Sequence, residues 1–330
     1  MNFDFDETQY ALRDLARDLF SRESPPSRLR GLWDGKPWDR GVWRTMAEAG
    51  LCGITVPEAY GGTGGSEIDL ALVAEEAGRA ALPEPLVETV AIAAPAIREL
   101  GSEDVRERWL PAIASGEAIV AVEGPSDGYA AWAGEADLVI CVRDGTAHAL
   151  PRERYQAAPL PAIDPARPLY RVEAETGPDT ALAGPLDWSR ALCGTAGVLN
   201  GIAMRLLEMT LEHVKAREQF GRPVGSFQAV KHKLADMHAA IASARPAAWY
   251  AAYAITTGAG DAGDAAAVAR VAAGNAEALC NRESLQCHGG MGFTWEHDLH
   301  LWLKRGIVLR SAFGDPAVHR RTIAHRLIAP

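Results

Sequence analysis

An arginine and an amide side chain stand on either side of a short break between two helical segments. Arg217 opens this stretch and Gln228 closes it, and Pro223 and Gly225 between them interrupt the helix. A guanidinium and an amide held close together at a helix junction can bind a diphosphate or another anion. An arginine at a helix end can equally be solvated or can cap the last carbonyls. The two residues alone therefore leave an anion site and a structural cap as open interpretations.

Apolar side chains on both sides of this break predict the two helices that must position it. Upstream, four residues recur at core spacing within an expected helix over 190–216: Leu199, Ile202, Leu206 and Met209. Downstream, a single apolar stripe with alternating intervals of three and four follows Ser226, the expected N-cap: Phe227, Val230, Leu234, Met237 and Ile241. The residues that could bind an anion thus lie where one helix ends and the next begins.

A second stretch is rich in glycine and reads Q-C-H-G-G-M-G-F-T over residues 286–294. Glycine has no Cβ, so Gly289 and Gly290 would let the backbone approach a ligand, although a plain turn explains each glycine equally well. A third stretch, L-C-G-I-T-V-P-E-A-Y-G-G-T-G-G over residues 51–65, ends in a flexible turn, and Ser66 is the expected N-cap of the helix that follows.

Together these three stretches resemble the acyl-CoA dehydrogenase family. Residues 217–228, R-E-Q-F-G-R-P-V-G-S-F-Q, are similar to the family's R-E-x-F-G-x-x-[IVL]-x-x-F-Q segment. Residues 286–293 resemble its Q-x-x-G-G-x-G-[FY] loop, and residues 51–65 resemble its G-[LI]-x-x-x-x-V-P-E-x-Y-G-G-x-G segment. The motifs occur in the family's order, and the resemblance covers nearly the whole chain except roughly residues 123–185. It implies a flavoprotein that uses FAD to dehydrogenate an acyl-CoA thioester.

The resemblance implies that this chain binds the part of FAD distant from the flavin ring. In the family, FAD lies across a subunit interface. One subunit supplies the flavin-ring pocket and the catalytic base, and its neighbour holds the pyrophosphate and adenosine. By this resemblance Arg217 would pair with the pyrophosphate through a charge-assisted contact. The remaining residues would line the adenosine end or bring backbone against the cofactor: Gln219, Phe220, Phe227, Gln228, Gln286, Gly289 and Gly290.

The flavin-ring half departs from the family pattern. Where the family typically has T-E-P-x-A-G-S-D, this chain reads A-V-E-G-P-S-D-G-Y over residues 121–129, and Val122 replaces the hydroxyl residue before the glutamate. The W-I-T-type strand that covers the flavin has no clear match, since Trp132 is followed by A-G-E-A-D. The resemblance therefore implies a damaged flavin-ring pocket in this chain.

No carboxylate stands at either family position of the catalytic base. Removing the α-proton of an acyl-CoA needs a carboxylate over that carbon. Most family members place a glutamate where this chain has Phe313-Gly314, and a minority place it where this chain has Ala191. Asp315 and Glu123 are the fallback candidates for a displaced base. Asp315, which precedes a proline, is expected instead to cap the last helix.

Composition and charge exclude several other classes of function. The 330 residues include 33 basic and 43 acidic side chains, a formal charge of −10 that argues against nucleic acid or an anionic membrane as the main partner. No apolar run is long enough to span a membrane, and the acidic N-terminus lacks a signal peptide's features, so a cytoplasmic location is expected. The five cysteines lack metal-ligand spacing, so reduced thiols and no metal site are expected: Cys52, Cys141, Cys193, Cys280 and Cys287.

The order of expected elements indicates an α+β fold that is mainly α. Helices are expected in the N-terminal part, with a Pro- and Arg-rich loop carrying Trp33 after the first of them: 5–22, 40–49, 67–80, 85–100 and 103–115. Short strands follow at 138–142, 147–150 and 170–172, and helix returns from residue 187 onward. In the arrangement of acyl-CoA dehydrogenases, we predict an N-terminal helical domain, a shortened middle β-domain and a C-terminal four-helix bundle: 1–116, 117–186 and 187–330.

Three hypotheses of function follow. In the first, the chain is the base-less subunit of a heteromeric acyl-CoA dehydrogenase, and a homologous partner supplies the catalytic glutamate; such enzymes often act on bulky acyl groups such as steroid side chains. In the second, it is a self-sufficient homo-oligomeric dehydrogenase that uses Asp315 or Glu123 as a displaced base. In the third, it is a non-catalytic scaffold. The first two need an acyl-CoA substrate, and by family resemblance an electron-transfer flavoprotein as electron acceptor.

Overall fold

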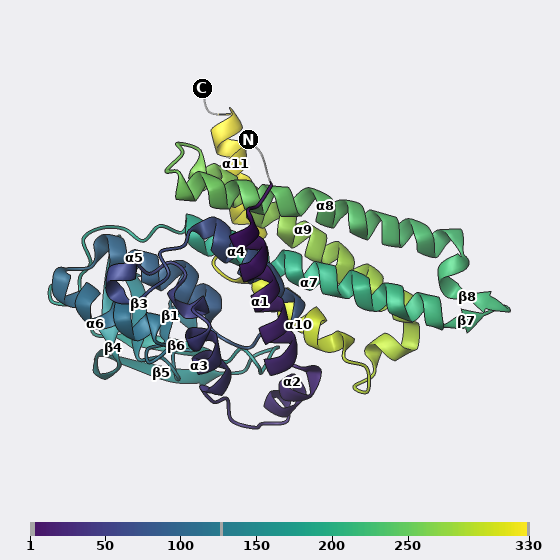
Figure 1. Ribbon diagram of the computed structural model, residues 1–330, viewed down its shortest axis with the longest axis horizontal. Helices are drawn as coiled ribbons and strands as arrows, with labels where there is room; N and C mark the ends of the chain where they lie inside the picture. The colour runs from purple at the N-terminus through teal and green to yellow at the C-terminus, as the bar shows by residue number, and fades with distance from the viewer. Residues whose placement is uncertain (1–3, 126–127, 329–330) are drawn as a thin grey trace.

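The computed structural model of the protein describes residues 4–125 and 128–328. Helices dominate it, and two small sheets separate an N-terminal from a C-terminal group of helices along the chain (Figure 1). The α+β, mainly α fold that the sequence predicts is confirmed. The domain boundaries after residues 116 and 186 stay predictions. None of the described helices is both long and apolar enough to cross a membrane.

The N-terminal group packs its helices around one apolar core. Its elements are α1 (Glu7–Glu23), α2 (Pro26–Trp33), α3 (Gly41–Glu48), α4 (Glu67–Arg79), the π-helical stretch η3 (Val87–Ala93), α5 (Ala94–Leu100) and α6 (Glu103–Ala114). Ser66 caps α4 as expected, because its hydroxyl accepts from the Asp69 amide while the Asp69 carboxylate accepts from the Ser66 amide.

The prediction of a loop after the first helix is wrong, because α2 forms there. Pro26 occupies the first helical position, where a missing amide hydrogen costs nothing and its fixed φ suits a helix. Leu29, which is 1% exposed, anchors the helix to the core. The proline that indicated a loop in the sequence is thus the residue that starts a helix.

The β region consists of two three-stranded sheets. In the first, β3 (Leu138–Arg143) pairs in parallel with β1 (Val120–Val122) and antiparallel with β4 (Thr146–Pro151). In the second, β6 (Leu169–Ala174) lies between its antiparallel neighbours β2 (Tyr129–Ala131) and β5 (Tyr155–Leu160). The three strands that the sequence predicts are confirmed as β3, β4 and β6.

The C-terminal group contains the longest helices of the protein. Its elements are α7 (Ser189–Ala216), β7 (Glu218–Gln219), β8 (Arg222–Pro223), η5 (Val224–Ser226), α8 (Gln228–Thr256), α9 (Ala262–His288), η6 (Gly289–Phe293), α10 (Leu299–Ser311) and α11 (Pro316–Ile328). The outer ends of α7, α8 and α9 run side by side beyond the rest of the molecule, and the β7–β8 hairpin joins α7 to α8 at the tip (Figure 1). We call this projecting part the arm.

Two glycines let α4 and α7 cross in backbone contact. A Cβ added to Gly201 would lie 1.8 Å from the carbonyl oxygen of Glu75, and one added to Gly78 would lie 2.0 Å from that of Val198. No side chain larger than a hydrogen fits at either position without moving a helix. This crossing places Val198 in the wall of a pocket that also contains Phe313.

Candidate functional site

The R-E-Q-F-G motif forms the turn of a tight hairpin at the tip of the arm. Phe220 and Gly221, between β7 and β8, both have positive φ, at 53° and 76°. Positive φ at both central residues is typical of the type I′ turn that joins two antiparallel strands. Phe220 adopts a conformation that a bulky residue rarely takes, and its side chain is 93% exposed. Such strain is often a mark of function.

Arg217 has a fixed backbone and an exposed side chain. Its amide donates to the His213 carbonyl at 2.8 Å, and its own carbonyl accepts from Val224 at 2.8 Å. Within the described residues, no hydrogen bond or ion pair engages the Arg217 guanidinium. The exposed amides of Gln219 and Gln228 lie on the two sides of the same hairpin. An anion placed here would meet a positive charge that the chain itself does not neutralise.

Aromatic rings line the other side of the hairpin. Phe227 meets the Phe220 ring edge-on at 6.2 Å, and the Arg222 guanidinium lies 4.1 Å from the Phe227 ring centroid. Phe227 occupies the N-cap position of α8, whereas Ser226 lies in η5, so the expectation of a Ser226 cap is wrong. The hairpin thus carries two aromatic rings, set nearly perpendicular to each other, in addition to the Arg217 guanidinium.

The glycine motif ends α9 at the same end of the bundle. The His288 ring stacks on that of His213 at 4.3 Å, which joins the residue before Gly289 to the helix that ends at Arg217. A Cβ added to Gly289 or Gly290 would meet nothing within 4 Å. Both glycines and Gln286 are exposed, so this loop offers open backbone near the last turns of α7, which lead into the hairpin.

These two motifs fit the distal part of FAD. An uncompensated guanidinium suits a pyrophosphate, exposed amides and aromatic rings suit an adenosine, and open glycine backbone allows close approach of a bulky group. Arg217, Gln219, Phe220, Phe227, Gln228, Gln286, Gly289 and Gly290 all lie on or beside the arm. The structure therefore brings the two motifs together, as a cofactor site would need. No cluster suited to a metal ion occurs among the described residues.

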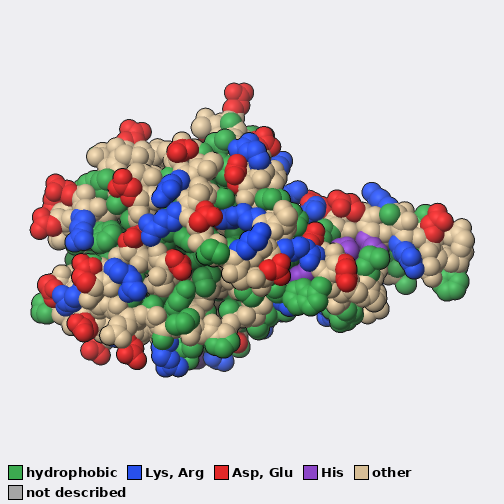
Figure 2. All heavy atoms as spheres, turned by 90° about the horizontal axis from the view of Figure 1, so that it is seen from below, with side chains coloured by type: hydrophobic (Ala, Val, Ile, Leu, Met, Phe, Trp, Pro, Cys, Tyr) green, Lys and Arg blue, Asp and Glu red, His purple; other side chains and the backbone are tan. Residues whose placement is uncertain are grey.

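Three histidine rings, those of His213, His288 and His297, lie together where the end of α7 meets the glycine loop. Histidine side chains are visible along the arm in Figure 2. The His297 ring lies 4.7 Å from that of His288 and 6.4 Å from that of His213. Burial, together with the positive charge that each neighbouring ring would carry, lowers the pKa of His288 to about 4. The His288 ring is therefore neutral near pH 7.

Stability should fall as the pH drops from 6.5 towards 4. The folded chain binds a proton at His288 less readily than the unfolded chain, whose imidazole keeps its ordinary pKa near 6.5, so the stabilisation is complete above that pH. The loss at this residue is at most about 3 kcal/mol. Urea unfolding at several pH values measures it. His288→Leu should flatten the profile, and the same change at the exposed His238 should not. An unaltered slope in His288→Leu would contradict this expectation.

The family positions of the base hold no carboxylate, and the fallback carboxylates are engaged elsewhere. Ala191 is buried in α7, and Phe313 and Gly314 follow α10. Asp315 is exposed and accepts from the Ala317 amide at 2.7 Å, which is an N-cap contact for α11. The Glu123 carboxylate is buried and accepts two hydrogen bonds from Arg143, at 2.9 and 2.8 Å. In the described structure, the pocket beside Phe313 is lined by neither Asp315 nor Glu123.

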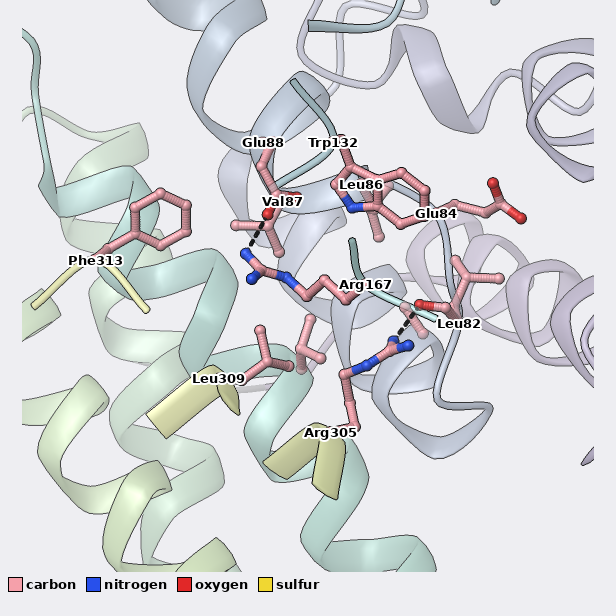
Figure 3. A pocket seen from close by; sticks show the side chains of 12 residues that line it. Leu82, Glu84, Leu86, Val87, Glu88, Trp132, Arg167, Arg305, Leu309 and Phe313 are labelled. Atoms are coloured by element: carbon pink, nitrogen blue, oxygen red, sulfur yellow. Dashed lines mark hydrogen bonds and ion pairs between the residues drawn. The ribbon is translucent and has the colours of Figure 1, made fainter. Parts of the chain in front are cut away.

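That pocket lies between the N-terminal helices, the β region and α10, and its own side chains fill it. Figure 3 shows Arg167 in its middle, reaching Glu88, with Trp132 on one side and Phe313 on another. The Arg167–Glu88 contact measures 2.5 Å. The cavity that remains is small, at about 30 Å³. No flavin ring or acyl chain fits without displacing these side chains.

A second buried cation, the Arg305 guanidinium, also lines the pocket. Arg305 of α10 pairs with Asp164 and donates to the carbonyls of Leu82 at 2.7 Å and Ala81 at 3.2 Å. Arg305 and Asp164 are both at least 95% buried. The ion pair and its carbonyl partners tie the C-terminal bundle to the β region and to the segment after α4.

Two carboxylates that line the pocket belong to none of the sequence motifs. Glu84 accepts from Arg28 at 2.7 Å and from the Trp38 indole at 2.9 Å, and burial raises its pKa to about 7. Glu88 pairs with Arg167. Both lie in the otherwise apolar stretch 81–97, where a charged residue must find a partner on folding. Two glutamates within an apolar stretch are therefore the sequence feature that indicates buried, paired carboxylates.

Comparison with known proteins extends over most of the chain. Residues 6–117 match the family model described as acyl-CoA dehydrogenase, N-terminal domain, and residues 176–328 match acyl-CoA dehydrogenase, C-terminal domain. The intervening residues 118–175, which include most of the β region, fall in neither range.

Individual relatives are similar over nearly their whole length. Acyl-CoA dehydrogenase IpdE2 of Mycobacterium tuberculosis is 36% identical over 303 residues, which cover 91% of each chain. A structure of the Tcur3481-Tcur3483 steroid ACAD G363A variant has a TM-score of 0.87 at 26% identity and covers 97% of this chain and 98% of that one. The fold also matches the ChsE4-ChsE5 complex from Mycobacterium tuberculosis, with a TM-score of 0.89 at 24% identity over 100% of both chains.

Proposed function

The chain belongs to the acyl-CoA dehydrogenase family, FAD-dependent oxidoreductases acting on the CH–CH bond of acyl-CoA thioesters, and we propose that it serves a heteromeric enzyme as the subunit that donates FAD-binding residues. A homologous partner then holds the flavin ring and supplies the catalytic glutamate. FAD supplies the hydride acceptor of the reaction. This chain contributes Arg217 to the pyrophosphate and its hairpin and glycine loop to the adenosine end.

The closed pocket beside Phe313 carries this proposal. A self-sufficient enzyme needs space there for a flavin ring and an acyl chain, and the cavity is about 30 Å³. Its two lining carboxylates, Glu84 and Glu88, are both bound to arginines. The pocket thus lacks both the volume and a free base.

The arm supports the proposal from the other direction. Val198 lines the closed pocket and Arg217 ends the same helix nineteen residues later, about 28 Å along the axis. Apart from the half-buried Phe227, the donor residues are exposed, and within the described residues the Arg217 guanidinium has no partner. A donor surface so far from its own pocket is suited to a cofactor held by another chain.

The substrate we propose is the CoA thioester of a bulky acyl group such as a steroid side chain. This rests on the likeness to the steroid ACAD variant named above. The partner would shape the acyl pocket, and an electron-transfer flavoprotein would accept the electrons. Turnover of short-chain and steroid-derived CoA esters by the purified complex, compared side by side, tests this part of the proposal.

The test of the donor role is the absorption spectrum of the protein purified alone and after co-expression with its nearest homologous partner. We expect no flavin in the isolated chain and about one FAD per pair of chains in the complex. Dehydrogenase activity should follow the flavin. A yellow isolated chain that reduces an electron acceptor with an acyl-CoA would refute the proposal, and a flavin-free complex would favour the scaffold hypothesis.

A second candidate function, a self-sufficient dehydrogenase, is favoured by one observation. Glu84 and Glu88 line the pocket, and burial raises the pKa of Glu84 to about 7, a suitable value for a general base. Arg167 would first have to leave Glu88. If the isolated chain is active, Glu84→Gln and Glu88→Gln separate these candidates from Asp315 and Glu123. Loss of activity with flavin retained would identify the base.

A further inference from the structure

Helix α2 contacts the segment that follows the glycine loop, although some 265 residues separate them along the chain. Arg30 makes three contacts with this segment. Its Nη1 donates to the Trp295 carbonyl at 2.5 Å, its Nη2 to the Glu296 carbonyl at 3.1 Å, and its Nε to the Asp298 carboxylate at 2.7 Å. A guanidinium bound at three points fixes both the position and the orientation of the backbone it touches.

Aromatic rings reinforce this contact. The Trp33 ring lies 5.6 Å from that of Trp295 and 5.3 Å from that of His300. The Lys304 ammonium lies 4.5 Å from the centroids of both indoles, where a cation is attracted by each ring face. Arg30 and Trp33 lie one turn apart on α2, so both contact the segment of residues 295–298. We call these two residues and Lys304 the clamp.

The glycine loop has few other long-range anchors. The side chain of Phe293 is 76% exposed and that of Met291 is 49% exposed, so neither is buried in the core. The other side-chain and turn hydrogen bonds of residues 289–298 are local within the described structure, such as the Thr294 amide to the Met291 carbonyl at 3.1 Å. The loop is therefore held at one end by α9 and His288, and at the other by the clamp together with the ring contacts of His297 with His288 and His213.

We infer that Arg30 is a positioning residue for the FAD-donating glycine loop, because it joins α2 to the backbone directly after that loop. The inference rests on the proposed donor role of Gly289 and Gly290. Arg30 would not touch the cofactor. It would hold the open glycine backbone where the cofactor of the partner subunit arrives, so that binding does not have to order the loop first.

Arg40 offers a matched control, since it makes the same kind of contacts elsewhere. It donates to the carbonyls of Glu117 at 2.8 Å and Glu135 at 3.0 Å, and it pairs with the Asp137 carboxylate at 2.9 Å. The side chains of Arg30 and Arg40 are 32% and 29% exposed. Arg40 contacts the β region and the segment after α6, not the glycine loop. Replacing either arginine should therefore lower the stability of the fold by a similar amount, but only the Arg30 change should weaken FAD binding.

The experiment measures FAD affinity of the co-expressed complex after removal and graded return of the cofactor. Arg30→Ala should weaken FAD binding about tenfold or more, the scale seen when a residue that orients the ligands of a metal site is lost. Arg30→Lys should be intermediate, because lysine can reach one acceptor at a time. Asp298→Ala, which removes one acceptor, is a milder variant should Arg30→Ala fold poorly. Arg40→Ala should bind FAD as the unmodified complex does, and turnover at saturating FAD should be unchanged throughout.

Hydrogen exchange supplies a readout independent of activity. Residues 289–296 should exchange faster in Arg30→Ala and remain unchanged in Arg40→Ala. Equal losses of FAD affinity in the two variants, or a less stable Arg30→Ala complex with normal FAD affinity, would overturn the inference. Arg217→Ala distinguishes this failure from failure of the donor role. If Arg217→Ala loses FAD and Arg30→Ala does not, only the positioning role fails.

Discussion

Replacing Arg217 with alanine is expected to strip FAD from the complex of this chain with its partner. The guanidinium is exposed and without a partner among the described residues, and the proposed complex would cover it with the pyrophosphate. Truncating one member of a covered, charge-assisted pair typically costs about 2 kcal/mol or more, which corresponds to at least about a thirtyfold loss of affinity. Fluorescence titration of the flavin-free complex with FAD measures the loss.

Arg282 provides the control for this substitution. It lies on α9 one turn before Gln286, its side chain is 70% exposed, and it forms an ion pair with the adjacent Glu283 at 2.9 Å. Arg282→Ala removes the same charge from the arm and should leave FAD affinity within about a factor of two, the usual scale of a surface change. Arg217→Lys should retain part of the affinity, because lysine keeps the charge but loses the bidentate geometry. Full FAD binding by Arg217→Ala would remove the arm from the cofactor site.

Replacing Asp164 with alanine is expected to be among the most destabilising single changes in the chain. It leaves the buried Arg305 guanidinium without its counter-ion, although the carbonyls of Ala81, Leu82 and Ala166 still accept from it. Breaking a buried ion pair by removing one partner costs about 3–5 kcal/mol. The urea concentration at the unfolding midpoint should fall accordingly.

An exposed ion pair gives the comparison for Asp164. Asp14 pairs with Arg13 at 2.7 Å on the surface of α1, and Asp14→Ala should change stability by less than about 1 kcal/mol. If the two variants unfold at the same urea concentration, the Arg305–Asp164 pair does not hold the pocket closed. If Asp164→Ala unfolds at a lower urea concentration than Asp14→Ala, the Arg305–Asp164 pair stabilises the fold with the pocket closed.

The sequence predicts the elements whose signals are local. The Ser66 cap, the strand at 138–142 and the long helix ending near Arg217 all depend on neighbours within a few residues. The hairpin at Phe220 has no such local signal, because two-residue strands leave no periodic pattern. The prolines predict a loop where α2 forms, because proline disfavours helix interiors but is favoured at the first helical position.

The donor and pocket residues differ in the same way. Arg217 and the glycines belong to contiguous motifs, so their grouping could be inferred before the fold was known. Arg167 and Glu88 are 79 residues apart, and Arg305 and Asp164 are 141 apart. Nothing local in the sequence pairs them. Their closure of the pocket follows only from how α10 and the β region meet.

The distance of about 28 Å along α7 between pocket and hairpin has an evolutionary consequence. Substitutions at residues that far apart and without shared neighbours act almost independently on stability. A duplicated gene could therefore lose one half of a catalytic centre without harming the other. Two paralogous chains can then specialise. In one of them, substitutions accumulate around the closed pocket while selection preserves the residues of the arm. Each would become indispensable to the other.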